Sequence, residues 1–301
     1  MDTPSAEQIA IWEKEYSPSE WNRRFPSAEQ VIEYHVQFVT EVSDQYRREL
    51  KCTLNVAYGP GKHEKIDIYG DDLPKDAPLL VYIHGGYWQM LSKNDSAYCA
   101  KPLVENGFRV IIVDYDLCPD VTLSEQVKQV KRAVQFIINN AAENNVNDIS
   151  LAGHSAGAHL IATSLDGDFL TAAGSGINLI KHLYLISGVY VLEELRHTKA
   201  VNTNNLLDLD QFKAISLSPL HLEYAHLTGL NLKVHLYVAE NDSNTFKHMS
   251  MNMCKHIQNY GIESSVQILP GLDHFDIVEK LSEENFVIIR DILKNSKVLI
   301  K

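Results

Sequence analysis

Residues 149–157 read Ile-Ser-Leu-Ala-Gly-His-Ser-Ala-Gly and join a short apolar run to a segment of small residues. The run Ile149–Ala152 predicts a buried strand, and the small residues from Ala156 to about Ser164 predict a helix. A Gly-x-Ser-x-Gly pentapeptide between a strand and a helix holds its serine in a strained, exposed turn. Its glycines let the strand and the helix approach without Cβ clashes. The stretch therefore predicts a nucleophilic Ser155; the alternative is a plain glycine-flanked turn, because the pentapeptide also occurs by chance.

Apolar runs alternate with helical patterns on both sides of this stretch. The predicted strands are 54–58, 65–69, 79–84, 109–114, 149–152, 182–186, 234–239 and 265–269. The predicted helices among and after them are 123–142, 156–164, 244–260 and 276–294. Such alternation is typical of right-handed β-α-β units. We therefore predict an α/β fold with a mostly parallel central sheet and helices on both faces.

Two segments depart from this alternation. Residues 1–50 predict an N-terminal helical extension, in which Ser27 and Gln30 have the spacing of a capping box. Residues 189–230 are irregular and rich in Leu, Asn and His, and we expect them to form a small cap over the carboxyl edge of the sheet. The whole chain, residues 1–301, is expected to form a single domain.

The composition is that of an ordinary globular protein, with 45% apolar and 22% charged residues among 301. With 27 basic and 39 acidic residues the net charge is −12, which argues against a nucleic-acid or anionic-membrane partner. The four cysteines form no Cys-x-x-Cys pair, and the N-terminus lacks the pattern of a signal peptide. No apolar run approaches the roughly 18 residues of a membrane span. We therefore expect a cytoplasmic protein that does not enter a membrane.

The loop after the predicted strand 79–84 reads His84-Gly85-Gly86-Tyr87-Trp88. Acyl transfer develops negative charge on a carbonyl oxygen, which preorganised backbone amides can bind. In α/β-hydrolases one such amide follows the nucleophile, and others come from a loop of the His-Gly-Gly type. The predicted oxyanion-hole residues are Gly85, Gly86, Tyr87 and Ala156, with Gly86 and Tyr87 favoured as loop donors. The alternative is a simple strand-end turn, and His84 itself is interpreted as a structural brace rather than an acid or base.

A serine hydroxyl needs a general base to take its proton, and the base needs an acid to orient it. In this fold the three residues follow in the order serine, acid, histidine along the chain. His274 follows the last predicted strand and is the only histidine beyond His256, so it is the predicted base.

The orienting acid is expected in the loop after the predicted strand 234–239. Asp242 is the favoured residue there, and Glu240, which lies closer to the end of the strand, is the alternative. Asp273 and Asp276 flank the predicted base and are interpreted as helix-start carboxylates, which the helix dipole favours.

No metal or organic cofactor is expected. His221 and His226 lack the spacing of a zinc protease, and the sequence contains neither a dinucleotide-binding nor a phosphate-binding glycine loop. His154 and His159, which flank the nucleophile, are interpreted as buried, hydrogen-bonded packing residues.

Taken together, the loop 84–88, the pentapeptide around Ser155, Asp242 and His274 resemble the kynurenine formamidases (arylformamidases) of animals and fungi, a family of α/β-hydrolases. The His-Gly-Gly-x-Trp form of the loop is the discriminating feature, because esterases of the hormone-sensitive-lipase type usually carry a third glycine. The tetrapeptide Tyr-Ser-Pro-Ser at residues 16–19 also matches that family.

This resemblance implies that the protein hydrolyses the formamide of N-formyl-L-kynurenine to L-kynurenine and formate, a step of tryptophan catabolism in the kynurenine pathway. It implies a formyl-enzyme on Ser155 and no cofactor. The small formyl group can be enclosed near the oxyanion amides. The aromatic and amino-acid ends need a larger pocket, to which Tyr87 and Trp88 are expected to contribute.

Two other functions stay open from the sequence. A carboxylesterase for short acyl or aryl esters would use the same residues. A catalytically silent hydrolase-fold binding module would keep the fold without turnover, although such proteins usually lose the serine or the histidine. The expected partner is a small molecule, and a homodimer is left open.

Overall fold

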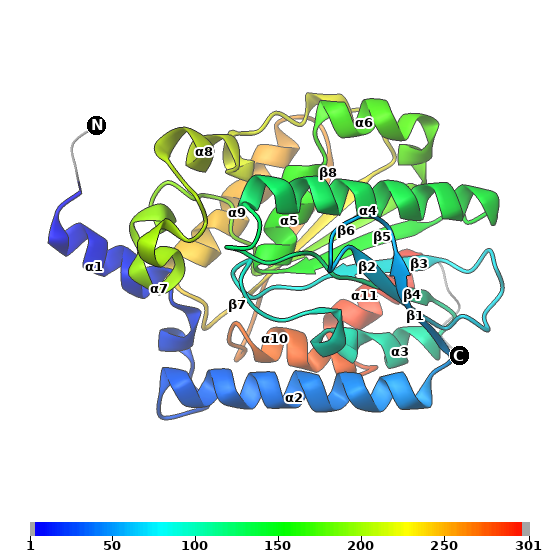
Figure 1. Cartoon of the computed structure of the whole chain (residues 1–301), viewed down its shortest axis with the longest axis horizontal. Helices are drawn as coiled ribbons and strands as arrows, with labels where there is room; N and C mark the ends of the chain where they lie inside the picture. The colour runs from blue at the N-terminus through cyan, green and yellow to red at the C-terminus, as the bar shows by residue number, and fades with distance from the viewer. Residues whose placement is uncertain (1–3, 297–301) are drawn as a thin grey trace.

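One sheet of eight strands occupies the centre of the molecule in a computed structural model that describes residues 4–296 (Figure 1). The strands are β1 Cys52–Ala57, β2 Lys65–Tyr69, β3 Leu79–Ile83, β4 Arg109–Val113, β5 Ile149–His154, β6 Ile180–Ile186, β7 Lys233–Ala239 and β8 Glu263–Leu269. Their order across the sheet is β1-β2-β4-β3-β5-β6-β7-β8. Only β2 runs antiparallel to its neighbours, β1 and β4. The predicted mostly parallel α/β sheet is confirmed, and each predicted strand is found with ends within two residues of the prediction.

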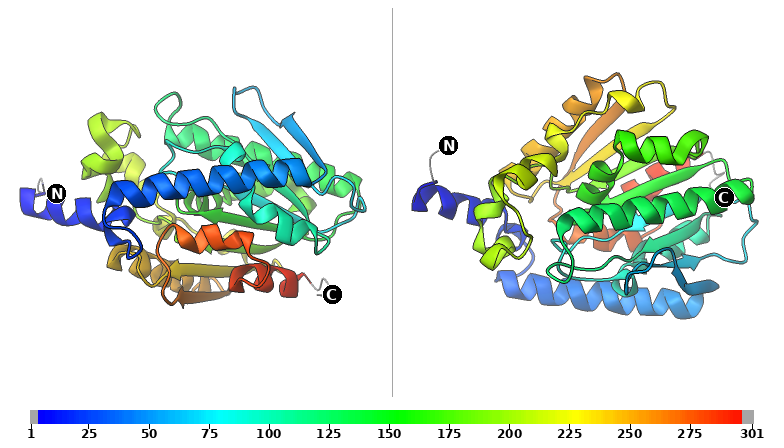
Figure 2. Two further views of the ribbon diagram at one scale, coloured as in Figure 1. Left: turned by 90° about the horizontal axis from the view of Figure 1, so that it is seen from below. Right: turned by 45° about the horizontal axis from the view of Figure 1, so that its top comes forward.

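Helices cover both faces of this sheet. They are α1 Ala6–Glu15, α2 Ala28–Glu49, α3 Ala100–Val104, α4 Leu123–Glu143, α5 Ala156–Ser164, α6 Gly167–Ala173, α7 Lys199–Asn202, α8 Gln211–Ser216, α9 Asn244–Gln258, α10 Asp276–Glu279 and α11 Val287–Asn295. In Figure 1, α4, α5 and α6 lie above the sheet, whereas α2, α3, α10 and α11 lie below it. Seen from below, α2 crosses this lower layer beside α10 (Figure 2, left).

The alternation of side chains along each strand creates a separate core on each face. On β3, Val81 and Ile83 pack in the core beneath α4 and α5, whereas Leu80 and Tyr82 point to the core beneath α2 and α11. All five residues of β3 are buried. A strand that is buried on both faces needs a nearly continuous apolar run, which is the pattern that the sequence shows there.

The predicted helix 276–294 is wrong, because the structure breaks it. After α10 the chain forms a 3-10 turn at Lys280–Ser282 and starts a new helix, α11, at Val287. The four residues 282–285 are all polar, and the hydroxyl of Ser282 donates to the carbonyl of Glu279 at 2.7 Å. Side chains of this kind compete with helical backbone hydrogen bonds. The break still leaves Ile277 and Ile289 in one core.

The long helix α2 starts where its cap was predicted. The amide of Gln30 donates to Oγ of Ser27 at 3.3 Å, and Val31, His35 and Val39 form the buried side of the helix. A side-chain cap satisfies one of the free amides of the first turn. The segment 189–230 contains the short helices α7 and α8 and several 3-10 turns.

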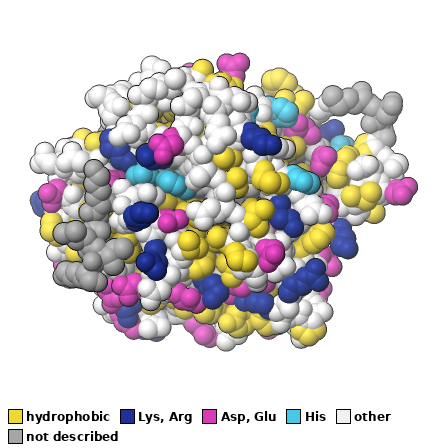
Figure 3. Space-filling view, turned by 180° about the vertical axis from the view of Figure 1, so that it is seen from behind, with side chains coloured by type: hydrophobic (Ala, Val, Ile, Leu, Met, Phe, Trp, Pro, Cys, Tyr) yellow, Lys and Arg dark blue, Asp and Glu magenta, His cyan; other side chains and the backbone are white. Residues whose placement is uncertain are grey.

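The charge of −12 is spread rather than concentrated on the face drawn in Figure 3. Basic and acidic side chains are interspersed across that face, with apolar side chains between them. Within residues 4–296, no helix has both the length and the apolar character that crossing a bilayer requires.

Candidate active site

Ser155 occupies the sharp turn between β5 and α5. Its backbone has φ 52° and ψ −114°, a region that residues with a side chain adopt only under strain. The turn depends on glycine at both flanks: a Cβ on Gly157 would lie 2.0 Å from the carbonyl oxygen of Ile83, and a Cβ on Gly153 would lie 2.6 Å from the carbonyl carbon of Gly157. Only residues without a side chain allow helix, strand and β3 to approach this closely.

His274 and Asp242 meet at the same edge of the sheet, in the loops that follow β8 and β7. Nδ1 of His274 lies 2.7 Å from Oδ1 of Asp242, and the Asp242 side chain is fully buried. Oδ2 of Asp242 accepts from the hydroxyl of Ser187 at 2.6 Å and from the amide of Ala239 at 3.2 Å. Because an ionised carboxylate only accepts hydrogen bonds, this contact holds the proton on Nδ1 and leaves Nε2 of a neutral imidazole free to accept one.

The other candidate acids have different partners. Glu240 accepts from the amide of Gly271 at 2.7 Å and has no contact with His274 among the described hydrogen bonds. Oδ1 of Asp273 accepts from the amide of Asp276 at 3.0 Å, as expected of a helix-start carboxylate. The geometry therefore favours Asp242 over Glu240 as the partner of the histidine.

The loop after β3 is held in a strained conformation with free amides. Gly86, Tyr87 and Trp88 have φ of 102°, 48° and 64° in succession, and a Cβ on Gly86 would lie 2.3 Å from the carbonyl oxygen of Met90. In the described part of the chain, the amides of Gly86 and Tyr87 donate to no protein acceptor. Ala156, the first residue of α5, likewise has no acceptor within its helix.

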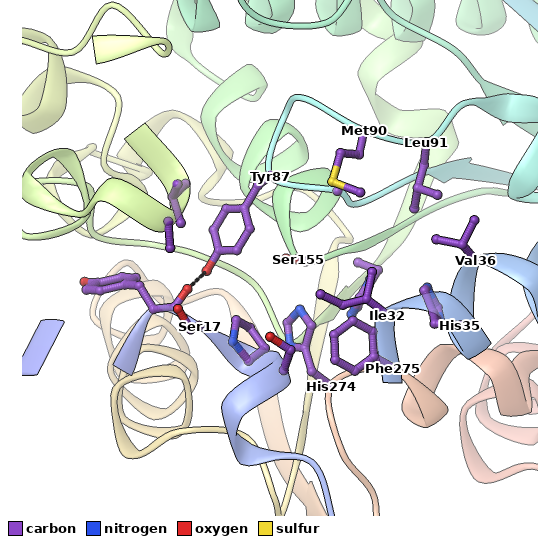
Figure 4. A pocket seen from close by; sticks show the side chains of 17 residues that line it. Ser17, Ile32, His35, Val36, Tyr87, Met90, Leu91, Ser155, His274 and Phe275 are labelled. Carbon is purple, nitrogen blue, oxygen red and sulfur yellow. Dashed lines mark hydrogen bonds between the residues drawn. The ribbon is translucent and has the colours of Figure 1, made fainter. Parts of the chain in front are cut away.

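A cavity of about 270 Å³ joins these elements (Figure 4). Ser155, His154 and His274 line it on the side of the sheet, and Gly86 and Tyr87 line it from the loop after β3. Most of the remaining lining is apolar. It consists of Tyr16, Ser17, Pro18, Ser19, Ile32, His35, Val36, Met90, Leu91, Ala200, Val201 and Phe275.

Several known proteins are similar to this chain over most of its length. The kynurenine formamidase of Salmo salar is 35% identical over 285 residues, which cover 94% of each chain. That of Drosophila melanogaster is 32% identical and covers 95% of this chain and 97% of its own. The chain belongs to the kynurenine formamidase family.

The fold agrees with this assignment. A family model described as BD-FAE matches residues 66–168. Among solved structures, an esterase B from Lactobacillus rhamnosis superposes with a TM-score of 0.67 at 19% identity, covering 89% of this chain and 96% of that one. The predicted α/β-hydrolase fold and the resemblance to kynurenine formamidases are both confirmed.

In this kynurenine formamidase family member, His84 supports the loop after β3. Its ring is fully buried and stacks on Tyr115 with 4.3 Å between the centroids, and Nδ1 bonds the carbonyl of Gly85 at 2.8 Å. Tyr115 also donates to the carbonyl of His84 at 2.9 Å. These contacts agree with a structural brace, the role interpreted from the sequence.

Trp88 requires a correction, because it does not line the cavity. The side chain is fully buried, and its indole Nε1 donates to Nδ1 of His159 at 3.2 Å. His159 in turn bonds the carbonyl of Leu217 at 2.8 Å. The positive φ of Trp88 turns the indole behind the loop, where it packs in the core instead of meeting a ligand. Tyr87 does face the cavity.

The hydroxyl of Tyr87 ties the loop to the N-terminal part of the chain. It donates to the carbonyl of Tyr16 at 2.6 Å, the dashed contact in Figure 4. Burial raises the pKa of Tyr87 well above its ordinary value, so the phenol stays protonated and keeps donating. In the sequence, the only feature that singled out this N-terminal segment was the family match at residues 16–19.

His154 was interpreted as a packing residue, but it also borders the cavity. Its ring centroid lies 4.6 Å from that of His274. Burial, together with the neighbouring His274, lowers the pKa of His154 well below its ordinary value. The lowered pKa makes His154 a weaker base and keeps its ring neutral beside His274.

Ser187 and the lining residues of α2 were not found from the sequence, because nothing local marks them. Among residues 4–296 there is also no group of three or more His, Cys, Asp or Glu side chains placed to hold a metal ion.

Proposed function

We propose that the protein hydrolyses N-formyl-L-kynurenine to L-kynurenine and formate, with Ser155 as nucleophile, His274 as base and Asp242 as the residue that orients it. One observation supports this most strongly. Curated kynurenine formamidases match 94–95% of the chain at 32–35% identity, and this same chain places a strained serine and a carboxylate-bound histidine on one cavity.

In the acylation step, Oγ of Ser155 attacks the formyl carbon while Nε2 of His274 takes the hydroxyl proton. The amides of Gly86, Tyr87 and Ala156 bind the oxyanion of the tetrahedral intermediate. His274 then gives its proton to the anilide nitrogen as the carbon–nitrogen bond breaks, and L-kynurenine leaves.

In the second step, water attacks the formyl ester on Ser155, and His274 takes a proton from that water. The carbon–oxygen bond to the serine breaks, His274 returns the proton to Oγ, and formate leaves. No metal or organic cofactor takes part in this scheme.

The cavity suits an aryl leaving group. Apart from His35, His154 and His274, no ionisable side chain other than the phenols of Tyr16 and Tyr87 lines it within the described residues. Ile32, Met90 and Phe275 offer apolar surface for an aromatic ring.

The test is turnover of N-formyl-L-kynurenine by the purified protein, with Ser155→Ala as the matched variant. We expect the parent to release formate and L-kynurenine, and Ser155→Ala to lose at least about three orders of magnitude in kcat while it keeps its fold. Activity of the variant within about tenfold of the parent would contradict the role of Ser155.

An esterase acting on short acyl or aryl esters is the second candidate function. It is favoured by the esterase structure that shares the fold, and by the fact that the proposed residues would cleave an ester by the same steps. Comparing kcat/KM on N-formyl-L-kynurenine with that on an aryl acetate separates the two. A higher value on the ester, with negligible release of formate from the formamide, would favour the esterase.

We also propose that the enzyme works in the cytoplasm. All four cysteines are free, and three of them are buried, which suits a reducing compartment.

A further inference from the structure

Arg24 lies in the turn before α2, and its guanidinium binds two carboxylates from the C-terminal part of the chain. Nε and Nη2 donate to Asp273 at 2.7 and 3.1 Å, and Nη1 and Nη2 donate to Glu279 at 2.7 and 3.2 Å. The two carboxylate side chains are 1% and 6% exposed, whereas that of Arg24 is 26% exposed. A planar guanidinium can serve two carboxylates in this forked way, and an ammonium cannot.

Asp273 directly precedes His274, and its carboxylate fixes the backbone on the other side of that histidine. Oδ1 of Asp273 accepts from the amides of Phe275 and Asp276 at 2.9 and 3.0 Å. The amide of Asp273 donates back to Oδ1 of Asp276 at 2.7 Å. These three hydrogen bonds hold the turn that contains His274, and Arg24 binds the Asp273 carboxylate that accepts two of them.

Arg24 also keeps this carboxylate ionised. Burial opposes the charged form, yet the hydrogen bonds from Arg24 and from the amides hold the pKa of Asp273 below its ordinary value. Without the guanidinium, a nearly buried negative charge would stay beside the histidine with no cation to balance it.

The same part of the chain forms one wall of the cavity. Ile32 and His35 of α2 line it, and Nδ1 of His35 bonds Oε1 of Glu279 at 2.9 Å. In Figure 4 these side chains lie beside Phe275, and the ring centroid of His35 is 5.1 Å from that of Phe275. Glu279 of α10 thus binds both Arg24, in the turn before α2, and His35 of α2.

We propose that Arg24 is a positioning residue for the reaction: by clamping Asp273 and Glu279, it holds the loop that presents His274 to Ser155. This inference rests on the proposed role of His274 as base, but not on the identity of the acyl or leaving group. Arg24 touches neither the substrate nor the reacting atoms, so its effect is transmitted through the orientation of the imidazole.

The test compares Arg24→Ala and Arg24→Lys with the parent on two substrates, N-formyl-L-kynurenine and an aryl acetate. Active sites are titrated with a fluorophosphonate and kcat is calculated per titrated site, so that misfolded protein does not lower the kcat value. We expect Arg24→Ala to lose about tenfold or more in kcat on both substrates with little change in KM, because small displacements of a catalytic group are costly. Arg24→Lys keeps the charge but not the fork, and we expect a smaller loss.

Arg23→Ala is the matched control. Arg23 is the neighbouring arginine, is exposed, and makes no ion pair or side-chain hydrogen bond within the part of the chain that the structure describes. We expect its kcat to stay within about twofold of the parent. A double variant, Arg24→Ala with Asp273→Asn, is expected to be no slower than the slower of its two single variants, because both act on one clamp.

Three results would overturn the proposal. The first is an Arg24→Ala variant whose kcat per titrated site equals that of the parent while its melting temperature is lowered. That result would mean that Arg24 has only a structural role. The second is a raised KM with unchanged kcat, which means an effect on the cavity wall alone. The third is a fold-loss of kcat in the double variant that equals the product of the fold-losses in its two single variants. If only the aryl acetate is turned over, the formamidase assignment fails, while kcat on the ester still tests the clamp.

Discussion

At the scale of single residues, the site depends on backbone positions that few residue types can occupy. Ser155 has a positive φ, which costs of the order of 1–3 kcal/mol, and in the loop after β3 two more residues with a side chain, Tyr87 and Trp88, also have a positive φ. The structure maintains this strain because glycines at 153 and 157 let the surrounding backbone pack tightly. The serine and the free amides are thereby fixed in place before any ligand binds.

Ser187 gives a residue-scale prediction. Its hydroxyl donates to Oδ2 of Asp242, and without it that oxygen keeps only the longer contact to the amide of Ala239. A hydrogen bond to a charged group contributes about 1.5–3 kcal/mol. We expect Ser187→Ala to lower kcat about tenfold or more with little change in KM, measured by steady-state kinetics.

Ser250→Ala is the control for that measurement. Ser250 is also buried, but its hydroxyl has no hydrogen-bond partner among the described residues, and it lies on α9. Its kcat is expected to match the parent. A kcat of Ser187→Ala within twofold of the parent would mean that Asp242 does not need this contact.

At the scale of elements, α1 and α2 differ in what holds them. Both helices start with a serine cap, Ser5 for α1 and Ser27 for α2. However, α1 buries none of its residues, whereas α2 buries a full stripe and contacts α10 and the 3-10 turns within residues 93–99. Most helical stability in proteins comes from packing of this kind.

This contrast predicts different effects of removing the two caps. Ser27→Ala should lower the free energy of unfolding by about 1 kcal/mol, a loss of roughly 2–4 °C in melting temperature. Ser5→Ala should leave the melting temperature unchanged, because α1 can fray without exposing the core. Thermal unfolding followed by calorimetry checks both, and equal shifts in the two variants would refute the distinction.

At the scale of the whole molecule, distant segments meet at the carboxyl edge of the sheet. Parallel strands all end at that edge, so the loops after β3, β5, β7 and β8 come together there. The N-terminal part of the chain also lines the cavity (Figure 4). Near the start of α2, the carboxylates of Asp273, Asp276 and Glu279 lie close together around Arg24, because they are spaced three residues apart along the chain.

That crowding predicts how stability depends on pH. Burial and the charge of Asp273 raise the pKa of Asp276 to about 7, from an ordinary value near 3.8. Between about pH 4 and pH 7 the folded chain therefore binds more protons at this group than the unfolded chain, and its contribution to stability falls as the pH rises. Asp273 has the opposite shift, so its contribution is lost as the pH falls below its ordinary value.

Asp276→Asn should remove the fall in stability that Asp276 causes as the pH rises. We expect the melting temperature of the variant relative to the parent to be higher at pH 8 than at pH 5, measured over a series of buffers. Asp72→Asn changes an exposed carboxylate, and its plot of melting temperature against pH should run parallel to that of the parent. A parallel curve for Asp276→Asn as well would refute the raised pKa.

The candidates Asp242 and His274 came from the order of the predicted strands along the chain, whereas local patterns determined the strands and the turn at Ser155. Each of these depends on residues within a few positions of one another, whose periodicity and turn chemistry are written in the sequence. The family resemblance rested on such short motifs too. The break after α10 is the exception among local features, because the apolar period continues across the polar residues 282–285.

Only the tertiary structure decided what surrounds these motifs. Trp88 turned into the core, Ser187 reached Asp242, and Arg24 reached Asp273 across 249 positions of sequence. Such contacts depend on how complete elements pack, because a side chain's neighbours across a core or cavity are set by the whole fold and not by the residues beside it in the chain.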